Sequence, residues 1–108
     1  MAKISKLSRV KKRGGELVPF RPRKIKEAIW NAAQSVAGKD KDLAYSIGQE
    51  VVKSLQSKYP GAVPSVEDIQ DVVEKSLVEG GHYRTAKAYI LFRHEREKER
   101  TEQEFVLG

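Results

Sequence analysis

The sequence contains no cysteine. This absence excludes disulfide bonds, thiolate zinc sites, a cysteine nucleophile and thiyl radical chemistry from the chain. The sequence also lacks any apolar run near the ~20 residues of a membrane span, and its basic N-terminus has no continuous apolar segment like that of a secretory signal. We therefore expect a cytoplasmic protein with no membrane-spanning segment.

Aromatic residues are scarce, at 7% of the 108 residues, whereas charged residues make up 33%. This length allows one domain with one modest core, which must be mainly aliphatic. The net charge of +6 is unevenly placed, because residues 1–26 hold ten Lys or Arg and a single acid, Glu16. The N-terminal segment therefore suits an anion such as nucleotide phosphate, nucleic acid or an anionic membrane, or else forms a solvated basic tail.

Apolar spacing and turn residues predict an α+β fold, in which a small basic hairpin lies on a bundle of four helices. Short strands are expected over residues 7–13 and 16–20. A two-residue turn at Gly14-Gly15 would join them, because glycine takes positive φ angles without penalty. Pro19 cannot donate a ladder hydrogen bond, so its strand is expected at a sheet edge.

Capping signals mark the helices that follow. The first is expected to begin near Pro22, since proline is tolerated at the first helical position, and to stop at Gly38. Asp42 is expected to be the N-cap of the second helix.

The third and fourth helices have equally clear boundaries. Ser65 is expected to cap the third, with Asp68 at the capping-box position, and Gly80-Gly81 to end it. The fourth is expected to begin near Tyr83. The chain thus divides into a basic arm at 1–8, a domain at 9–96, and a charged helix extension or linker at 97–108.

The basic hairpin carries the chemistry of an anion site. Cations, free backbone amides and a helix N-terminus are the parts from which polyphosphate sites are built. Lys12 and Arg13 precede the predicted turn, and Arg21 and Lys24 lie at the start of the first helix. If the hairpin folds back on the helices, these cations converge. Three apolar side chains nearby offer a face to a base: Val18, Phe20 and Ile25. The alternative is a solvated hairpin tip.

Two further cations lie on the fourth helix. Lys87 and Arg93 flank an apolar stretch, and a cation so deep in an apolar helix needs a partner, for which a phosphate is one candidate. The alternative is snorkelling, or salt bridges to one of the acids of the third helix: Asp71, Glu74 or Glu79. The sequence has neither a Walker A motif nor a GxGxxG motif.

The order and spacing of several short motifs resemble the ATP-cone domain family. The first half of the chain carries Lys12-Arg13, Gly15, Phe20, Lys24-Ile25 and Ala28-Ile29. The second half carries Val66, Ile69-Gln-Asp-Val-Val-Glu74, Leu77, Ala86-Lys87-Ala88-Tyr89-Ile90 and Arg93. Each motif is weak alone, but together they cover residues 9–96 in the expected order.

The resemblance implies a regulatory nucleotide-binding domain, like those at the N-terminus of ribonucleotide reductase catalytic subunits and in a zinc-ribbon repressor of reductase genes. It implies a four-helix bundle capped by a small β-sheet, with a third short strand around Ala62-Val63. The implied ligand is ATP or dATP, with Mg²⁺. The implied partners are a reductase catalytic domain or subunit and, in some oligomeric states, further copies of the chain. In the family, ATP supports activity and dATP inhibits it.

The resemblance also implies which positions contact the nucleotide. Lys12, Arg13 and Lys87 should contact phosphates, Lys24 should lie at the nucleotide, and Val18 and Arg21 should lie near the base or sugar. Together with Ile25 and Arg93, which the residues themselves suggest, these form the predicted nucleotide-binding site. No metal site built by protein side chains is expected, and no catalytic residue.

Three other functions stay open on the residues alone. Residues 3–26 suit a nucleic-acid-binding arm of a transcriptional regulator, which would bind with steep salt dependence. Residues 93–104 suit an oligomerisation helix, although they lack apolar a and d positions. Enzyme activity has the least support, because His82 and His94 are the only histidines and no nucleophile–base arrangement is apparent.

Overall fold

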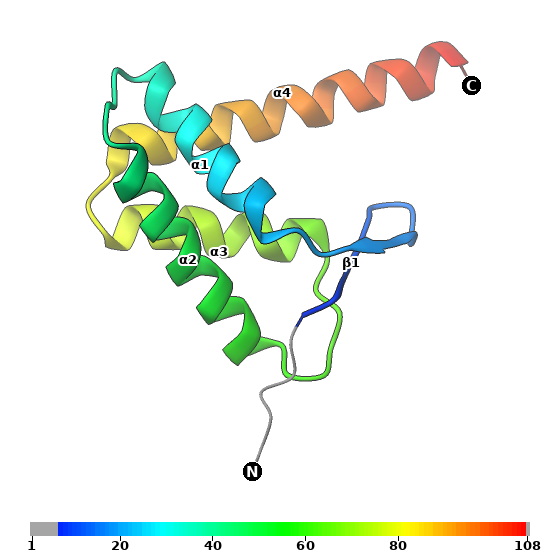
Figure 1. The fold of residues 1–108 in the computed structure, drawn as a ribbon. Coiled ribbons are helices and arrows are strands. Elements are labelled where there is room, and N and C mark those ends of the chain that lie inside the picture. The colour runs from blue at the N-terminus through cyan, green and yellow to red at the C-terminus, as the bar shows by residue number, and fades with distance from the viewer. Residues whose placement is uncertain (1–6, 108) are drawn as a thin grey trace.

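The structure is a computed structural model that describes the backbone of residues 7–107 and the side chains of residues 7–99. This part of the chain forms two short strands followed by four helices (Figure 1). In chain order they are β1 Arg9–Lys11, β2 Leu17–Pro19, α1 Pro22–Ser35, α2 Lys41–Lys58, α3 Val66–Glu79 and α4 Tyr83–Leu107. The predicted α+β fold, a small hairpin on four helices, is confirmed.

Contacts of β1 attach the hairpin to the bundle. Its strands pair antiparallel, with Val10 opposite Val18, and the buried side chain of Val10 joins the core. The backbone N–H of Lys11 donates to the carbonyl of Pro64 at 3.0 Å, and Lys11 forms a parallel bridge with Ser65. These contacts place the hairpin beside the start of α3. The third strand expected around Ala62-Val63 does not form, and the bridge lies two residues further on, at Ser65.

The hairpin turn differs from the prediction. The N–H of Gly15 donates to the carbonyl of Lys12 at 2.8 Å, and the N–H of Lys12 donates to the carbonyl of Glu16 at 2.8 Å. Within this turn only Gly15 has a positive φ, of 91°. This is the three-residue loop in which a type I turn is followed by a left-handed glycine. The predicted two-residue turn at Gly14-Gly15 is therefore wrong, and Arg13 lies at the tip.

The predicted end of α1 and the predicted N-cap of α2 are both wrong. α1 begins at Pro22 as predicted, but it ends at Ser35, and Ala37 rather than Gly38 takes the left-handed φ, of 65°. Glycine is still required at position 38, because a Cβ there would lie 2.7 Å from a carbonyl oxygen of α1. The N-cap of α2 is Asp40, whose carboxylate accepts the N–H of Leu43 at 2.9 Å, and not Asp42.

The predicted boundaries of α3 and α4 are confirmed. Ser65 and Asp68 form the capping box, with both hydrogen bonds at 3.0 Å. Gly81 takes a φ of 82° after the end of α3, and α4 begins at Tyr83. Because each cap satisfies backbone groups that the helix leaves unpaired, these residues fix where the helices stop and start.

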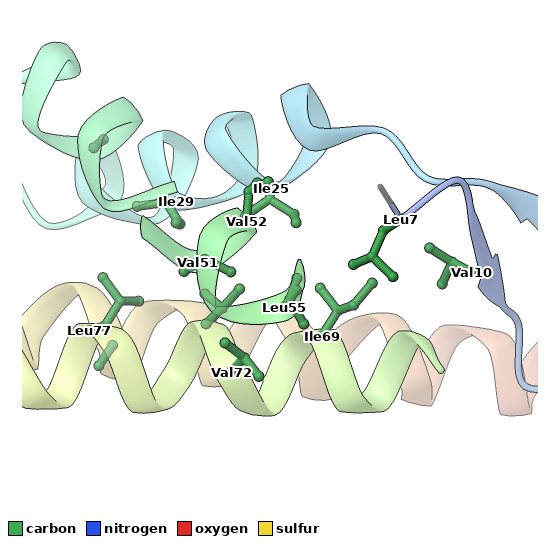
Figure 2. Close-up of a cluster of buried hydrophobic side chains, with 13 residues drawn as sticks. Leu7, Val10, Ile25, Ile29, Val51, Val52, Leu55, Ile69, Val72 and Leu77 are labelled. Carbon is green, nitrogen blue, oxygen red and sulfur yellow. The ribbon is translucent and has the colours of Figure 1, made fainter. Parts of the chain in front are cut away.

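The four helices form a closed ring around an aliphatic core. α1 packs on α2 and α4, and α3 also packs on α2 and α4. The largest fully buried side chains among the described residues are Ile29, Leu55, Leu77, Val51, Val73 and Pro64. Figure 2 shows Leu7 and Val10 extending this core toward the hairpin, beside Leu55 and Ile69. Leu7, which was assigned to the N-terminal arm, is thus part of the core.

α4 is longer than the other helices and continues past the bundle. In Figure 1 its C-terminal half, in orange to red, runs beyond α1 on the side of the molecule where the hairpin lies. The helical character predicted for the charged segment is confirmed through Leu107. Within the described residues, no helix has the length and apolar content to cross a membrane.

Candidate functional site

A hollow of about 330 Å³ lies along α1 and α4, and we refer to it as the α1–α4 hollow. Ala28 and Asn31 line it from α1, Gln70 lines it from α3, and Tyr89 and Phe92 contribute two aromatic side chains from α4. The volume falls within the range of ~300–1,000 Å³ that is typical of small-molecule pockets. The hollow therefore has the size and the mixed polar and aromatic walls of a ligand site.

The α4 wall is also strongly charged. Arg93 and Arg96 line the hollow together with Glu95 and Glu99. Helical periodicity explains this arrangement, because residues 89, 92, 93, 96 and 99 recur at intervals of three and four and so share one side of α4. One face of this helix thus carries both aromatic surface and cations.

The α1 wall continues toward the hairpin. Lys24, Ala28 and Asn31 are spaced by four and three residues, so they lie on one face of α1. Lys24 also lines a second, more open hollow at the start of α1, of about 500 Å³, together with Phe20 and Arg21. The first turn of α1 therefore extends the wall of the α1–α4 hollow with basic side chains, beside backbone N–H groups that have no helical partner.

Arg93 is anchored by carboxylates of α3. Its side chain is only 18% exposed and its Nη1 atom donates hydrogen bonds to Asp71, at 3.0 Å, and to Glu74. Partial burial by itself would lower the pKa of Arg93, but the hydrogen bonds to Glu74 and Asp71 outweigh burial and raise the pKa above its usual range. This is the salt-bridge alternative that the sequence left open for Arg93.

Arg13, at the tip of the hairpin, reaches both α3 and α4. Its Nε atom lies 3.5 Å from Oε2 of Glu67, and its Nη2 atom lies 3.6 Å from Oε1 of Glu97. The same Glu97 oxygen lies 3.6 Å from Nε of Arg93. Two arginines and four carboxylates are thus joined, and we call them the Arg–Glu network: Arg13, Arg93, Glu67, Asp71, Glu74 and Glu97.

Both burial and the neighbouring carboxylates change the pKa of Tyr89. Burial, with a contribution from Glu74, raises the pKa of Tyr89 to about 12. The phenol is therefore neutral at physiological pH and offers the hollow a hydroxyl donor and a ring face, not a charge.

Above pH 10 we expect Tyr89 to make folding less favourable. Its pKa is raised in the folded state, so its contribution is fully present below the unfolded pKa of ~10 and is lost as the pH rises toward 12. The parent chain should lose up to ~2 kcal/mol more stability than Tyr89→Phe between these pH values. Urea unfolding of both proteins at several alkaline pH values measures this difference, and parallel pH profiles would contradict it.

The remaining predicted contacts occupy different environments. Lys12, Arg21 and Lys24 are exposed, and no ion pair involves them among the described side chains. Val18 is half-buried and packs against the core, as does Phe20. Ile25 is buried in the core, so its side chain has little surface for a ligand.

Lys87 lies apart from the other predicted site residues. It is exposed, so it needs no buried partner, contrary to the expectation for a cation deep in an apolar helix. Arg96 follows nine residues later, and at 3.6 residues per turn this is about two and a half turns. Lys87 therefore lies on the side of α4 opposite Arg96 and does not line the α1–α4 hollow, while the buried small residues Ala86 and Ala88 flank it.

Of the residues that line the hollow, the sequence-based site named only Arg93. It omitted the other eight: Ala28, Asn31, Gln70, Tyr89, Phe92, Glu95, Arg96 and Glu99. Spacing offered a partial signal for Arg96, because it follows Arg93 by three residues and Tyr89 by seven, on one helical face. Nothing in the spacing of α3 distinguishes Gln70 from an ordinary exposed polar residue. Among the described residues, no group of three or more His, Cys, Asp or Glu side chains is arranged to hold a metal ion.

Comparison with known proteins agrees with this architecture. The family described as the ATP cone domain matches residues 8–98. A vitamin B12-dependent ribonucleoside-diphosphate reductase of Mycobacterium tuberculosis is 39% identical over 98 residues, which cover 91% of this chain and 14% of the relative. An anaerobic ribonucleoside-triphosphate reductase of Escherichia coli is 36% identical over 91 residues, covering 84% of this chain and 12% of the relative.

The family match defines a nucleotide-binding module, because the chain belongs to the ATP-cone domain family over residues 8–98. Domains of this family bind ATP or dATP and have a regulatory role. A third relative, a vitamin B12-dependent reductase of Thermoplasma acidophilum, is 39% identical over 105 residues, again covering 93% of this chain but only 13% of the relative. The chain therefore spans about an eighth of the length of the reductases that it matches.

Proposed function

We propose that this domain binds ATP or dATP in the α1–α4 hollow and regulates a ribonucleotide reductase allosterically. The observation that carries the proposal is a hollow lined by two arginines of α4, with further cations on the neighbouring α1 and hairpin. Arg93 and Arg96 come from α4, Lys24 lies on the α1 face that lines the hollow, and Arg13 reaches α4 from the hairpin. Guanidinium forks and lysine ammonium groups are the side chains that bind polyphosphates.

The nucleotide is proposed to lie with its phosphates against α4 and its base toward the hairpin. The phosphate end is assigned to Arg93 and Arg96, because these cations line the hollow. The base end is assigned to the apolar surface of Val18 and Phe20, which are half-buried beside the start of α1. Lys24, one turn before Ala28, lies between these two regions.

Mg²⁺ fits this arrangement as an ion carried by the nucleotide. Mg²⁺ keeps several waters and is usually held by phosphates with one or two carboxylates. Glu95 and Glu99 are four residues apart on α4 and both line the hollow, so they provide such carboxylates beside the proposed phosphate position. When bound, the ion would offset part of the charge of the triphosphate.

Regulation requires that ATP and dATP favour different arrangements of the domain. A ligand shifts an equilibrium only by its difference in affinity for two states. The hairpin is the element most suited to move, because it touches α4 through exposed ion pairs at Arg13 and the bundle through Val10 and the single bridge at Lys11. The proposed partner is a reductase catalytic domain or subunit, since the matched relatives are reductases.

A thermal-shift titration tests this proposal. ATP at 100 times its Kd should stabilise the folded chain by ~2.7 kcal/mol, which raises the melting temperature of a domain of this size by roughly 10 °C or more. We expect such shifts with ATP and dATP, larger with Mg²⁺ than without it, and small shifts with GTP.

The titration is repeated at two salt concentrations and with duplex DNA. No shift with any nucleotide, together with salt-sensitive DNA binding, would contradict the proposal and favour the nucleic-acid-binding alternative.

A further inference from the structure

Among the described side chains, the carboxylates of the Arg–Glu network outnumber its arginines next to the proposed phosphate position. The network joins two arginines to four carboxylates. A triphosphate carries up to four further negative charges, so the carboxylates oppose its approach. It can bind these arginines only where a carboxylate moves away from its guanidinium partner. The network is therefore a competitor of the ligand as well as a structural element.

Glu97 occupies the central position of the network. Its Oε1 atom lies 3.6 Å from Nη2 of Arg13 and 3.6 Å from Nε of Arg93. One carboxylate oxygen thus lies between a guanidinium of the hairpin and a guanidinium of α4. An anionic oxygen between two guanidinium groups is also the arrangement in which a phosphate oxygen is bound.

We infer that Glu97 is an internal competitor of the nucleotide triphosphate, which must displace it from Arg13 to bind. The inference rests on the proposed function. It means that the ion pair between Arg13 and Glu97 holds the hairpin tip on α4 until the nucleotide binds. In the nucleotide-free chain Glu97 and Glu67 hold Arg13 against the helices. On binding, a phosphate oxygen takes the place of the Glu97 oxygen, and the hairpin tip follows the ligand.

The exposure of the two arginines decides which of them exchanges its partners. The side chain of Arg13 is 45% exposed and its contacts with Glu67 and Glu97 are long, whereas Arg93 is 18% exposed and hydrogen-bonded to Asp71 and Glu74. Exposed ion pairs contribute little free energy and are screened by salt, so they exchange readily. Arg13 is therefore the mobile arginine, and Arg93 is the fixed one.

The test compares Glu97→Gln with the parent chain by calorimetric titration of ATP and of inorganic tripolyphosphate. We expect Glu97→Gln to bind both probes about 3- to 10-fold more tightly, because the amide keeps the shape of the side chain and removes its charge. The gain should shrink at high salt. The matched control is Glu50→Gln on α2, an exposed carboxylate outside the network, which should leave both affinities unchanged.

A second readout follows the side chain of Arg13 directly, without and with ligand. The Nε–H resonance of Arg13, assigned through its loss in Arg13→Lys, should shift in nucleotide-free Glu97→Gln and should shift when tripolyphosphate is added to the parent chain. Unchanged or weaker binding by Glu97→Gln, or an Arg13 resonance that moves in neither case, would overturn the inference.

If the parent binds tripolyphosphate but no adenine nucleotide, the proposed function fails while the comparison of the two proteins still decides the role of Glu97. If the parent binds neither probe, both are overturned.

Discussion

Replacement of Arg96 by alanine is expected to weaken ATP binding by about 10- to 100-fold. Arg96 lines the α1–α4 hollow, and no ion pair involves it among the described side chains. Its guanidinium can therefore give its full charge to phosphate, whereas the guanidinium of Arg93 shares its charge with three carboxylates. Hydrogen bonds to charged groups contribute ~1.5–3 kcal/mol, and each 1.4 kcal/mol changes Kd tenfold. Calorimetric titration of the variant measures the loss directly.

Lys87→Ala is the matched control for this prediction. Both substitutions remove one positive charge from α4, and both residues are exposed, but Lys87 does not line the hollow. We expect Lys87→Ala to bind ATP within about twofold of the parent chain, because only distant, screened charge is lost. Equal losses in the two variants would indicate a nonspecific effect of net charge, and a larger loss in Lys87→Ala would move the phosphate position to the other side of α4.

Replacement of Leu55 by alanine is expected to reduce the stability of the fold by ~2–5 kcal/mol. Leu55 has 0% exposure, in the core between α2 and its neighbours (Figure 2). The variant loses the transfer free energy of the deleted atoms and leaves a cavity that a close-packed core fills only in part. For a domain of this size the melting temperature should fall by roughly 10 to 30 °C.

Leu43→Ala provides the control for the core. It makes the same substitution on the same helix at a side chain that is 44% exposed. We expect its stability to remain within ~0.5 kcal/mol of the parent. Thermal and urea unfolding of the two variants measure the difference, and a loss at Leu43 as large as that at Leu55 would contradict the assignment of the core.

The helices were predictable because their signals are local. Ser65 and Asp68 form the predicted capping box, and proline begins α1 where the sequence placed it. The N-cap of α2 was misplaced because Asp40 and Asp42 are equally good caps by residue type, and only the chain path after Ala37 decides between them. The aliphatic character of the core was predictable from composition, since aromatic residues make up only 7% of the sequence.

The hairpin turn shows where local signals become ambiguous. Two consecutive glycines suit a two-residue turn, but they also suit a three-residue loop in which only the last glycine is left-handed. The second arrangement is the one formed. The difference decides the position of Arg13, which stands at the tip and reaches Glu97.

The site on α4 was only partly predictable because the rotation of this helix depends on the whole bundle. Its first half is apolar on several sides, so spacing alone did not show which side is buried. The bundle buries the small side chains of Ala86 and Ala88 and leaves Leu91 exposed. This rotation places Arg96 in the hollow and Lys87 outside it. The contribution of Gln70 depends on the packing of α3 against α4, which no local pattern encodes.

Backbone amide mapping during an ATP titration tests the central claim most directly. Binding in the α1–α4 hollow should shift the amide resonances of three segments together: the hairpin turn at 12–15, the α1 face at 24–31 and the α4 face at 89–96. The α2 segment 49–58 should change little. Saturable shifts confined to other surfaces, or no shifts at millimolar ATP, would contradict the assignment of this hollow as the nucleotide site.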